Sequence, residues 1–127
     1  MRNKLAAVVA VVAMGAFATS AFASHGNGDV RAAGSCTGAS SSKIKVKPDD
    51  GRIEVEFEVD QNKVGQRWAV SISDNGATVF NGSAVTQAPS GSFDVERKIA
   101  DRPGTDAITA TARNAATGER CTASASI

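Results

Sequence analysis

Two cysteines are the residues of this 127-residue chain whose type and spacing most clearly suggest chemistry. Cys36 and Cys121 are separated by most of the sequence, whereas redox-active pairs more often have a short spacing such as C-x-x-C. In an exported protein, two such cysteines usually form a structural disulfide. A crosslink that closes a loop of this length contributes roughly 4–5 kcal/mol on the chain-entropy view. The sequence therefore predicts one small domain stapled by Cys36–Cys121.

Residues suited to catalysis are scarce. His25 is the only histidine, and it lies in a Ser/Gly-rich stretch near the start of the expected mature chain. A histidine relay or a histidine-bound zinc ion is therefore not expected. The glutamates of residues 54–58 alternate along one outward strand face, without exposed aromatic rings that would hold a sugar for hydrolysis by carboxylates. We expect that the protein is not an enzyme.

The start of the chain has the three zones of an export signal. Arg2 and Lys4 form a basic start, residues 5–17 are apolar, and Ala21-Phe22-Ala23 offers small residues for cleavage after Ala23. The apolar run is too short to span a bilayer, which needs about 20 residues. We expect a secreted, extracellular protein without membrane insertion. The chain divides into a signal peptide (1–23), a flexible N-terminal tail (24–35) and one domain (36–127).

Charge gives little indication of a polyanionic partner. The full chain has a formal net charge of +1, and the signal peptide would remove Arg2 and Lys4. The mature protein is thus close to neutral and has no overall electrostatic attraction to nucleic acid or to an anionic membrane. We expect a monomer that does not bind nucleic acid.

Apolar and polar residues alternate with a period of two along residues 43–47 and 53–59, which predicts a hairpin. Pro48-Asp49-Asp50-Gly51 supplies the turn between them. Closing the turn on Asp49-Asp50 predicts these cross-strand pairs: Ile44 with Val55, Val46 with Ile53, Lys45 with Glu54, and Lys43 with Glu56. Opposite charges across a strand pair stabilise it modestly, and a slip by one residue would bury them. The charged ladder is therefore interpreted as a device that fixes the register.

A second hairpin is predicted from residues 67–73 and 77–82, joined at Asn75-Gly76. Its register stays open. A two-residue turn would set Val79 opposite Ile72 and expose Phe80, whereas a three-residue turn would bury Phe80 and expose Val79. Trp68 lies on the inward face in either case.

The rest of the chain continues the alternation. Strands are predicted at residues 92–99, 105–113 and 120–126. The last two should pair so that small residues face each other, with Cys121 beside Ala112, Ala123 beside Ala110 and Ala125 beside Ile108. This thin layer would let the start of the domain come close enough for Cys36 to reach Cys121.

Seven short strands with a tryptophan in the third predict an all-β, seven-stranded antiparallel β-sandwich. From Cys36 to Ile127 this arrangement resembles the immunoglobulin-like or fibronectin type III-like domain, with Trp68 at the core position and residues 106–110 before the sixth strand. The whole chain is also similar to small secreted actinomycete proteins of unassigned function, through residues 49–57 and 114–121. These resemblances imply a bacterial immunoglobulin-like β-sandwich after a cleaved signal peptide.

The predicted topology collects two groups of loop residues at opposite ends of the sandwich. One end brings together hard oxygen donors suited to Ca²⁺, although turns use the same residue types: Asp49, Asp50, Asp74, Asp101 and Asp106. The other end is a candidate partner-binding surface, as is common for loops on a rigid scaffold: Gln61, Asn62, Lys63, Gln87, Arg113 and Asn114. No cofactor is expected unless Ca²⁺ binds at the first end.

Taken together, these features favour a secreted, non-catalytic binding or interaction module with an unknown protein or cell-surface partner. One alternative is an extracellular carrier of a small apolar molecule, which would need a pocket lined by apolar groups beyond those of the core. Another is a Ca²⁺-stabilised module of a cell surface or matrix. The last strand is also a candidate exposed edge for a partner's strand.

Overall fold

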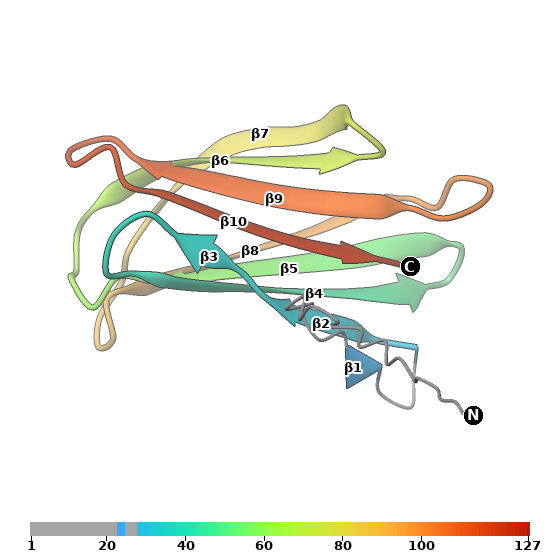
Figure 1. The fold of residues 1–127 in the computed structure, drawn as a ribbon, viewed down its shortest axis with the longest axis horizontal. Helices are drawn as coiled ribbons and strands as arrows, with labels where there is room; N and C mark the ends of the chain where they lie inside the picture. The colour runs from blue at the N-terminus through green and yellow to red at the C-terminus, as the bar shows by residue number, and fades with distance from the viewer. Residues whose placement is uncertain (1–22, 25–27) are drawn as a thin grey trace, which may run out of the picture.

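The computed structural model describes residues 23–24 and 28–127, which form ten β-strands in two stacked antiparallel sheets (Figure 1). His25 and all of the predicted signal peptide except Ala23 lie outside the described residues. In this part of the chain no helix is long and apolar enough to cross a membrane. The all-β, two-layer architecture expected from the alternating sequence is therefore confirmed.

Each sheet has five strands, named below in their spatial order. Sheet A consists of β1 (Ala23–Ser24), β2 (Val30–Ala33), β4 (Ser41–Asp49), β5 (Arg52–Asp60) and β8 (Ser92–Ala100). Sheet B consists of β3 (Ser35–Cys36), β10 (Arg120–Ser126), β9 (Ala107–Asn114), β6 (Arg67–Asp74) and β7 (Ala77–Val85). Hairpins join β4 to β5, β6 to β7 and β9 to β10, while the chain changes sheet after β2, β3, β5, β7 and β8.

The predicted count of seven strands is wrong, because three strands precede the seven that correspond to β4–β10. Residues 24–35, expected to be a flexible tail, contain β2, which pairs with β4. The chain then passes to sheet B at Gly34, whose N–H donates to the Ser42 carbonyl at 2.8 Å. A Cβ atom on Gly34 would lie 2.5 Å from the Thr122 carbonyl oxygen, so only glycine fits this crossing. These strands escape prediction because this short, Ser/Gly-rich segment has almost no alternation.

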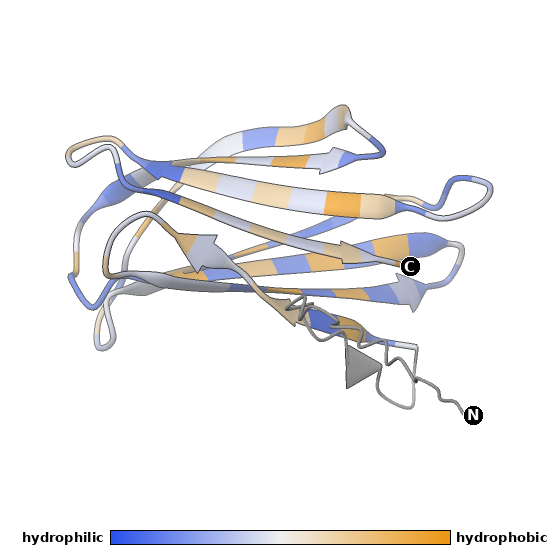
Figure 2. Cartoon of the chain, in the orientation of Figure 1, coloured by the Kyte–Doolittle hydropathy of each residue, from blue (hydrophilic) through white to orange (hydrophobic). Residues whose placement is uncertain are grey.

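The core lies between the sheets and is formed by the inward face of every long strand. Hydrophobic and hydrophilic residues alternate along β4 and β5 in Figure 2, as the period of two predicts. Trp68 of β6 is fully buried, its ring centroid lies 6.0 Å from that of Phe93 on β8, and Phe57 of β5 is buried as well. The β9–β10 side of the core is filled by alanine, which lets β10 contact β4 and β2.

The first hairpin has the predicted faces but a different register. Val46 pairs with Val55 and Ile44 with Phe57, which is a shift of two residues from the expected pairs. The turn consists of Asp50 and Gly51, with φ of 53° and 77°. A two-residue turn with both φ values positive matches the twist of the flanking strands, and Asp-Gly is one of its preferred sequences. The predicted turn on Asp49-Asp50 is therefore wrong, and Pro48 lies within β4 opposite Ile53.

The second hairpin combines both expected alternatives. Asn75 and Gly76 form a two-residue turn with φ of 52° and 87°, which pairs Asp74 with Ala77. A β-bulge then shifts the register, so that Ile72 pairs with Phe80. Both Val79 and Phe80 are half-buried as a result. The extra residue of the bulge, which the sequence pattern does not reveal, explains why neither simple register holds.

The predicted register of the last hairpin is confirmed. Cys121 pairs with Ala112, and Ala123 pairs with Ala110. On the other side of β10, Cys36 of β3 lies directly opposite Cys121 and forms the predicted disulfide with it. The last strand is therefore not an exposed edge along its whole length, because β3 covers its beginning.

Candidate functional site

The aspartates predicted at one end of the sandwich do not form a single group. Asp49 forms an ion pair with Lys98 of β8, with 2.9 Å between Oδ2 and Nζ. The hydrogen bond and charge of Lys98 hold the pKa of Asp49 below its usual value. Asp50 is exposed in the β4–β5 turn. These two residues are therefore separate from the other three.

Asp74, Asp101 and Asp106 do come together, where the end of β6 meets the loop before β9. Asp74 is fully buried and Asp106 is 1% exposed, while Asp101 is exposed. Both oxygens of Asp74 and Oδ2 of Asp106 have no hydrogen-bond partner among the described residues other than each other's carboxyl groups. The nearest cation is Arg102, whose Nε lies 3.8 Å from Asp74 Oδ2.

Burial is the main cause that raises the pKa of Asp74 from its usual 3.8 to about 6. The hydrogen bond and negative charge of Asp106 raise it further, and Arg102 opposes them. The pKa of Asp101 is raised as well, chiefly by a hydrogen bond with Asp106. Asp74 and Asp101 are therefore protonated more readily than ordinary aspartates, and the free oxygens of the cluster are also of the type that Ca²⁺ prefers.

At the opposite end, two of the predicted contact residues are part of the scaffold. Gln61 accepts a hydrogen bond from Trp68 Nε1 at 3.0 Å, which satisfies the buried indole. Asn114 is 1% exposed, and its Oδ1 accepts hydrogen bonds from the N–H groups of Ala116 and Thr117. Gln61 Oε1 and the buried side chain of Asn114 thus support the fold at this end.

The other four predicted contact residues are exposed. Asn62 has a φ of 60°, and its N–H donates to the Asp60 side chain and to the Gly91 carbonyl. The Lys63 carbonyl accepts a hydrogen bond from Thr86 Oγ1, and the residue is exposed. Gln87 donates from Nε2 to the carbonyl of Val85 at the edge of β7. Arg113 lies on the outer face of sheet B, and its guanidinium group is close to Gly118 in the turn between β9 and β10.

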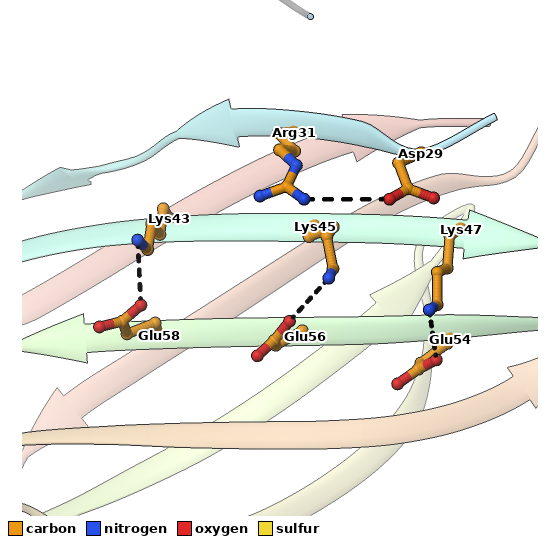
Figure 3. Close-up of polar contacts among 8 residues, drawn as sticks. All are labelled: Asp29, Arg31, Lys43, Lys45, Lys47, Glu54, Glu56 and Glu58. Atoms are coloured by element: carbon orange, nitrogen blue, oxygen red, sulfur yellow. Dashed lines mark ion pairs between the residues drawn. The ribbon is translucent and has the colours of Figure 1, made fainter. Parts of the chain in front are cut away.

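Three parallel ion pairs cross the outer face of sheet A (Figure 3). Lys43 pairs with Glu58, Lys45 with Glu56 and Lys47 with Glu54, with N–O distances of 3.2, 3.3 and 3.5 Å. The predicted ladder exists, although Lys43 and Lys45 each pair with the glutamate two residues further along than expected, and Lys47–Glu54 is an additional pair. Such surface pairs contribute little energy individually. Their regular spacing fits a role in fixing the register of β4 against β5.

The strand beyond the ladder, β8, adds negative charge. Asp94 lies opposite Glu58, and Glu96 lies opposite Glu56. Partial burial, followed by the charges of Glu58 and Glu56, raises the pKa of Asp94. A hydrogen bond with Glu54 raises the pKa of Glu96. The edge of sheet A at β8 is therefore strongly charged.

A hollow with a volume of about 380 Å³ lies beside this ladder, on β2, β4 and β5. Five of the eight residues that line it are charged: Arg31, Lys43, Lys45, Glu56 and Glu58. The remaining three are Ala32, Ala33 and Ile44. This lining is unlike the apolar wall that binds a hydrophobic small molecule.

Cys36, Cys121 and Glu119 bring two sulfur atoms and a carboxylate close together. The sulfurs are joined to each other and so are not metal ligands. Glu119 instead accepts hydrogen bonds from the N–H groups of Gly38 and Ser40 and from Ser40 Oγ, at 2.8–3.0 Å. It thereby fixes the loop after β3 against the turn between β9 and β10.

The free edge of β7 is a feature that the sequence analysis does not single out. In the part of the chain that the structure describes, β7 pairs with β6 only, so its outer side has no neighbouring strand. Thr86 N–H donates to the Gln66 carbonyl, and this bond shows which residues of β7 direct their backbone groups toward β6. Antiparallel pairs alternate, so the backbone groups of Asn81 and Ser83 point outward, away from β6. A signal is present in the sequence, because residues 75–93 contain no charged residue.

Comparison with known proteins does not assign this chain to a family. No protein-family model matches the chain, and no curated protein matches it either.

Proposed function

We propose that the chain is exported, loses residues 1–23 and acts outside the cell as a non-catalytic binding module that takes up an extended segment of a partner protein at the edge of β7. The Cys36–Cys121 disulfide supports an oxidising destination. The finer fold belongs to the same proposal: β4–β5–β8 packed on β10–β9–β6–β7, with Trp68 on β6, supports an immunoglobulin-like or fibronectin type III-like domain.

The observation that carries the proposal is the contrast between β7 and the other edges. β8 is the other long edge, and it carries exposed charges at Asp94, Glu96, Arg97 and Lys98. Arg97 occupies an inward position opposite Val55 and stacks on the Phe80 ring, 4.3 Å from its centroid. Charges and an inward-pointing cation are devices that prevent strand addition. The remaining edges, β1 and β3, are two residues long.

β7 has none of these charges over nine residues. Its bulge at Val79 disrupts the regular backbone only in the half of the strand near the turn. The Val85 carbonyl already accepts a hydrogen bond from Gln87 Nε2. This leaves the outward N–H and C=O groups of Asn81 and Ser83, together with the N–H of Val85, to bind a strand. Phe80 and Ala84 are half-buried on the inward side. A partner strand should therefore be uncharged, with an apolar residue on the side that covers Phe80.

Peptides selected from a displayed library of extended nonapeptides would test this edge, using the oxidised domain as target. Ser83→Pro removes the outward N–H without removing a hydrogen bond to β6. Ser83→Ala is its matched control, because both variants lose the hydrogen bond from Arg67 Nη1 to Ser83 Oγ. We expect Ser83→Pro to weaken binding by about tenfold or more, and Ser83→Ala to leave it nearly unchanged. Selected peptides that bind both variants equally would contradict the proposal. Dimers that form through β7 would show that a second copy is the occupant.

Ca²⁺ stabilisation is the second candidate, and the unsatisfied oxygens of Asp74 and Asp106 favour it. A bound cation would offset the cost of burying these charges. Thermal unfolding with increasing CaCl₂ measures this. A saturable rise in melting temperature that is lost in Asp106→Asn but kept in Asp50→Asn would support the site, and an equal response of both variants would count against it.

The carrier alternative has less support, because the 380 Å³ hollow is lined mainly by charged residues. Mass spectrometry of the intact protein under native conditions would detect an apolar molecule that is released on denaturation.

A further inference from the structure

The outer face of sheet B has a composition unlike that of sheet A. The outward positions of β6, β9 and β10 hold mostly small or hydroxyl side chains, and three hold arginine: Arg67, Arg113 and Arg120. None of these positions holds a carboxylate. This described face is therefore positively charged, whereas each lysine on the outer face of β4 has a glutamate partner.

The three arginines lie close together. Arg113 and Arg120 are direct cross-strand partners on β9 and β10, and Ala69 of β6 pairs with Arg113 on its other side. Arg67 is the next residue of β6 on the same face, diagonal to Arg113. Directly opposed side chains have Cβ atoms about 5 Å apart, and diagonal ones about 7–8 Å.

These cations are not neutralised within the described residues. No carboxylate there lies within 4.0 Å of the side-chain nitrogens of Arg67, Arg113 or Arg120. The nearest acid in the sequence, Glu119, is engaged by Gly38 and Ser40. Like charges directly opposed across a strand pair destabilise it. An arrangement that keeps Arg113 opposite Arg120 therefore has a cost that an anion between them would remove.

A hollow of about 240 Å³ lies beside the pair. It extends over the middle of the face, where Ala69 has only a small side chain to fill it. Its polar lining consists of Ser71, Asn81, Thr111, Arg113 and Arg120. Guanidinium groups bind carboxylate, phosphate or sulfate oxygens with two parallel hydrogen bonds, and the hydroxyl and amide groups can bind hydroxyls of the same ligand.

We propose that Arg113 and Arg120, with Arg67 beside them, form an anion-binding site on the outer face of sheet B, and that it takes an oxyanion carried by an acidic oligosaccharide. The three guanidinium groups suit a ligand with more than one oxyanion, and the neighbouring hydroxyls suit its sugar hydroxyl groups. The site does not depend on strand addition at β7, because its cations come from β6, β9 and β10.

The test titrates the oxidised domain with trigalacturonate and follows its backbone amide signals by NMR. Inorganic phosphate and neutral maltotriose are titrated in parallel. We expect saturable shifts with trigalacturonate that centre on Ser71, Thr111, Arg113 and Arg120. Arg113→Gln and Arg120→Gln should each weaken binding by about tenfold or more. Arg52→Gln is the matched control, because it removes one exposed positive charge from sheet A, and it should change the affinity by less than about twofold.

Each arm has a defined meaning. Tighter binding of trigalacturonate than of phosphate supports an acidic sugar, and equal binding of both supports the same arginine site with a free oxyanion as ligand. Maltotriose binding as tightly as trigalacturonate would overturn the proposal. So would the absence of saturable shifts with either anion, or an equal loss of affinity in Arg52→Gln. The amide spectra themselves confirm that each variant is folded.

Discussion

At the scale of single residues, Asp74 is a side chain whose ionised form is poorly stabilised by its surroundings at neutral pH. Its side chain is buried and has Asp106 as its neighbour, and the only nearby cation among the described residues is Arg102 at 3.8 Å. Its pKa of about 6 lies above the usual 3.8, so the ionised form is disfavoured in the folded state. Below pH 4 the group is protonated in both the folded and unfolded states, and its full stabilising contribution is present. That contribution is lost as the pH rises through about 6.

Asp74→Asn should therefore raise the free energy of unfolding at pH 7.5, by at most about 3 kcal/mol from the difference between the two pKa values. The amide can also donate a hydrogen bond to Asp106, as the protonated acid does. Urea unfolding between pH 4.5 and pH 7.5 measures both proteins. We expect the gain to shrink as the pH falls, whereas the exposed control Asp50→Asn should change stability little at any pH. A gain that does not depend on pH would contradict the assignment.

Glu119 is the residue whose loss should loosen the beginning of the domain. Its carboxylate binds Gly38 N–H and both polar groups of Ser40, and hydrogen bonds to a charged acceptor contribute about 1.5–3 kcal/mol at most. We expect Glu119→Ala to speed amide exchange at Gly38 and Ser40 and to speed reduction of the neighbouring disulfide by dithiothreitol. Glu58→Ala, which loses a surface ion pair in sheet A, is the control. Unchanged exchange at Gly38 in Glu119→Ala would rule this role out.

At the scale of elements, the turns fix the strand register that the alternation of apolar and polar residues leaves undetermined. A shift of two residues between β4 and β5 preserves both faces and still pairs lysine with glutamate, so the pattern could not distinguish the expected register from the observed one. The positive φ of Asp50 and Gly51 distinguishes them. The register of β9 and β10 was predictable because small residues must face each other there.

Other parts of the site were not predictable from the sequence for a different reason. Asp74 and Asn114 are buried, although their residue types are typical of exposed turns, because long-range packing closes over the ends of β6 and β9. The arginine pair is a different case, because the expected register of the last hairpin already places Arg120 opposite Arg113, although the sequence analysis names only Arg113, at the partner-binding end.

The turn argument gives a prediction for the first hairpin. Gly51→Ala should destabilise the domain by about 1–2 kcal/mol, because φ is +77° and an alanine there is strained. An added Cβ meets nothing within 4 Å, so the effect isolates the backbone conformation. Gly51→Asn should retain most of the stability, because asparagine tolerates this region. Urea unfolding of both variants checks the order, and an alanine variant as stable as the asparagine variant would refute it.

At the scale of the whole molecule, the two open sides of the sandwich are closed by different means. On one side the chain itself bridges the sheets, with β2 in sheet A, β3 in sheet B and the disulfide to β10. On the other side β7 and β8 are not hydrogen-bonded to each other, and Arg97 stacked on Phe80 spans the gap. The side that is closed by the disulfide should therefore stabilise the fold, while the edge of β7 is left accessible.

Replacing both cysteines by alanine should reveal this division. β3 pairs with β10 through only two residues, so it should detach once the bond is absent. Opening the loop that this bond closes, with a sequence separation of 85, should lower the free energy of unfolding by roughly 4–5 kcal/mol on the chain-entropy view. Amide exchange should rise at Ser35 and Thr37 before it rises at β6. Peptide binding at Ser83 should persist in the folded variant, because β6 and not β3 supports that edge. A variant that keeps full stability, or that loses β7 binding together with β3, would show that the two sides are not independent.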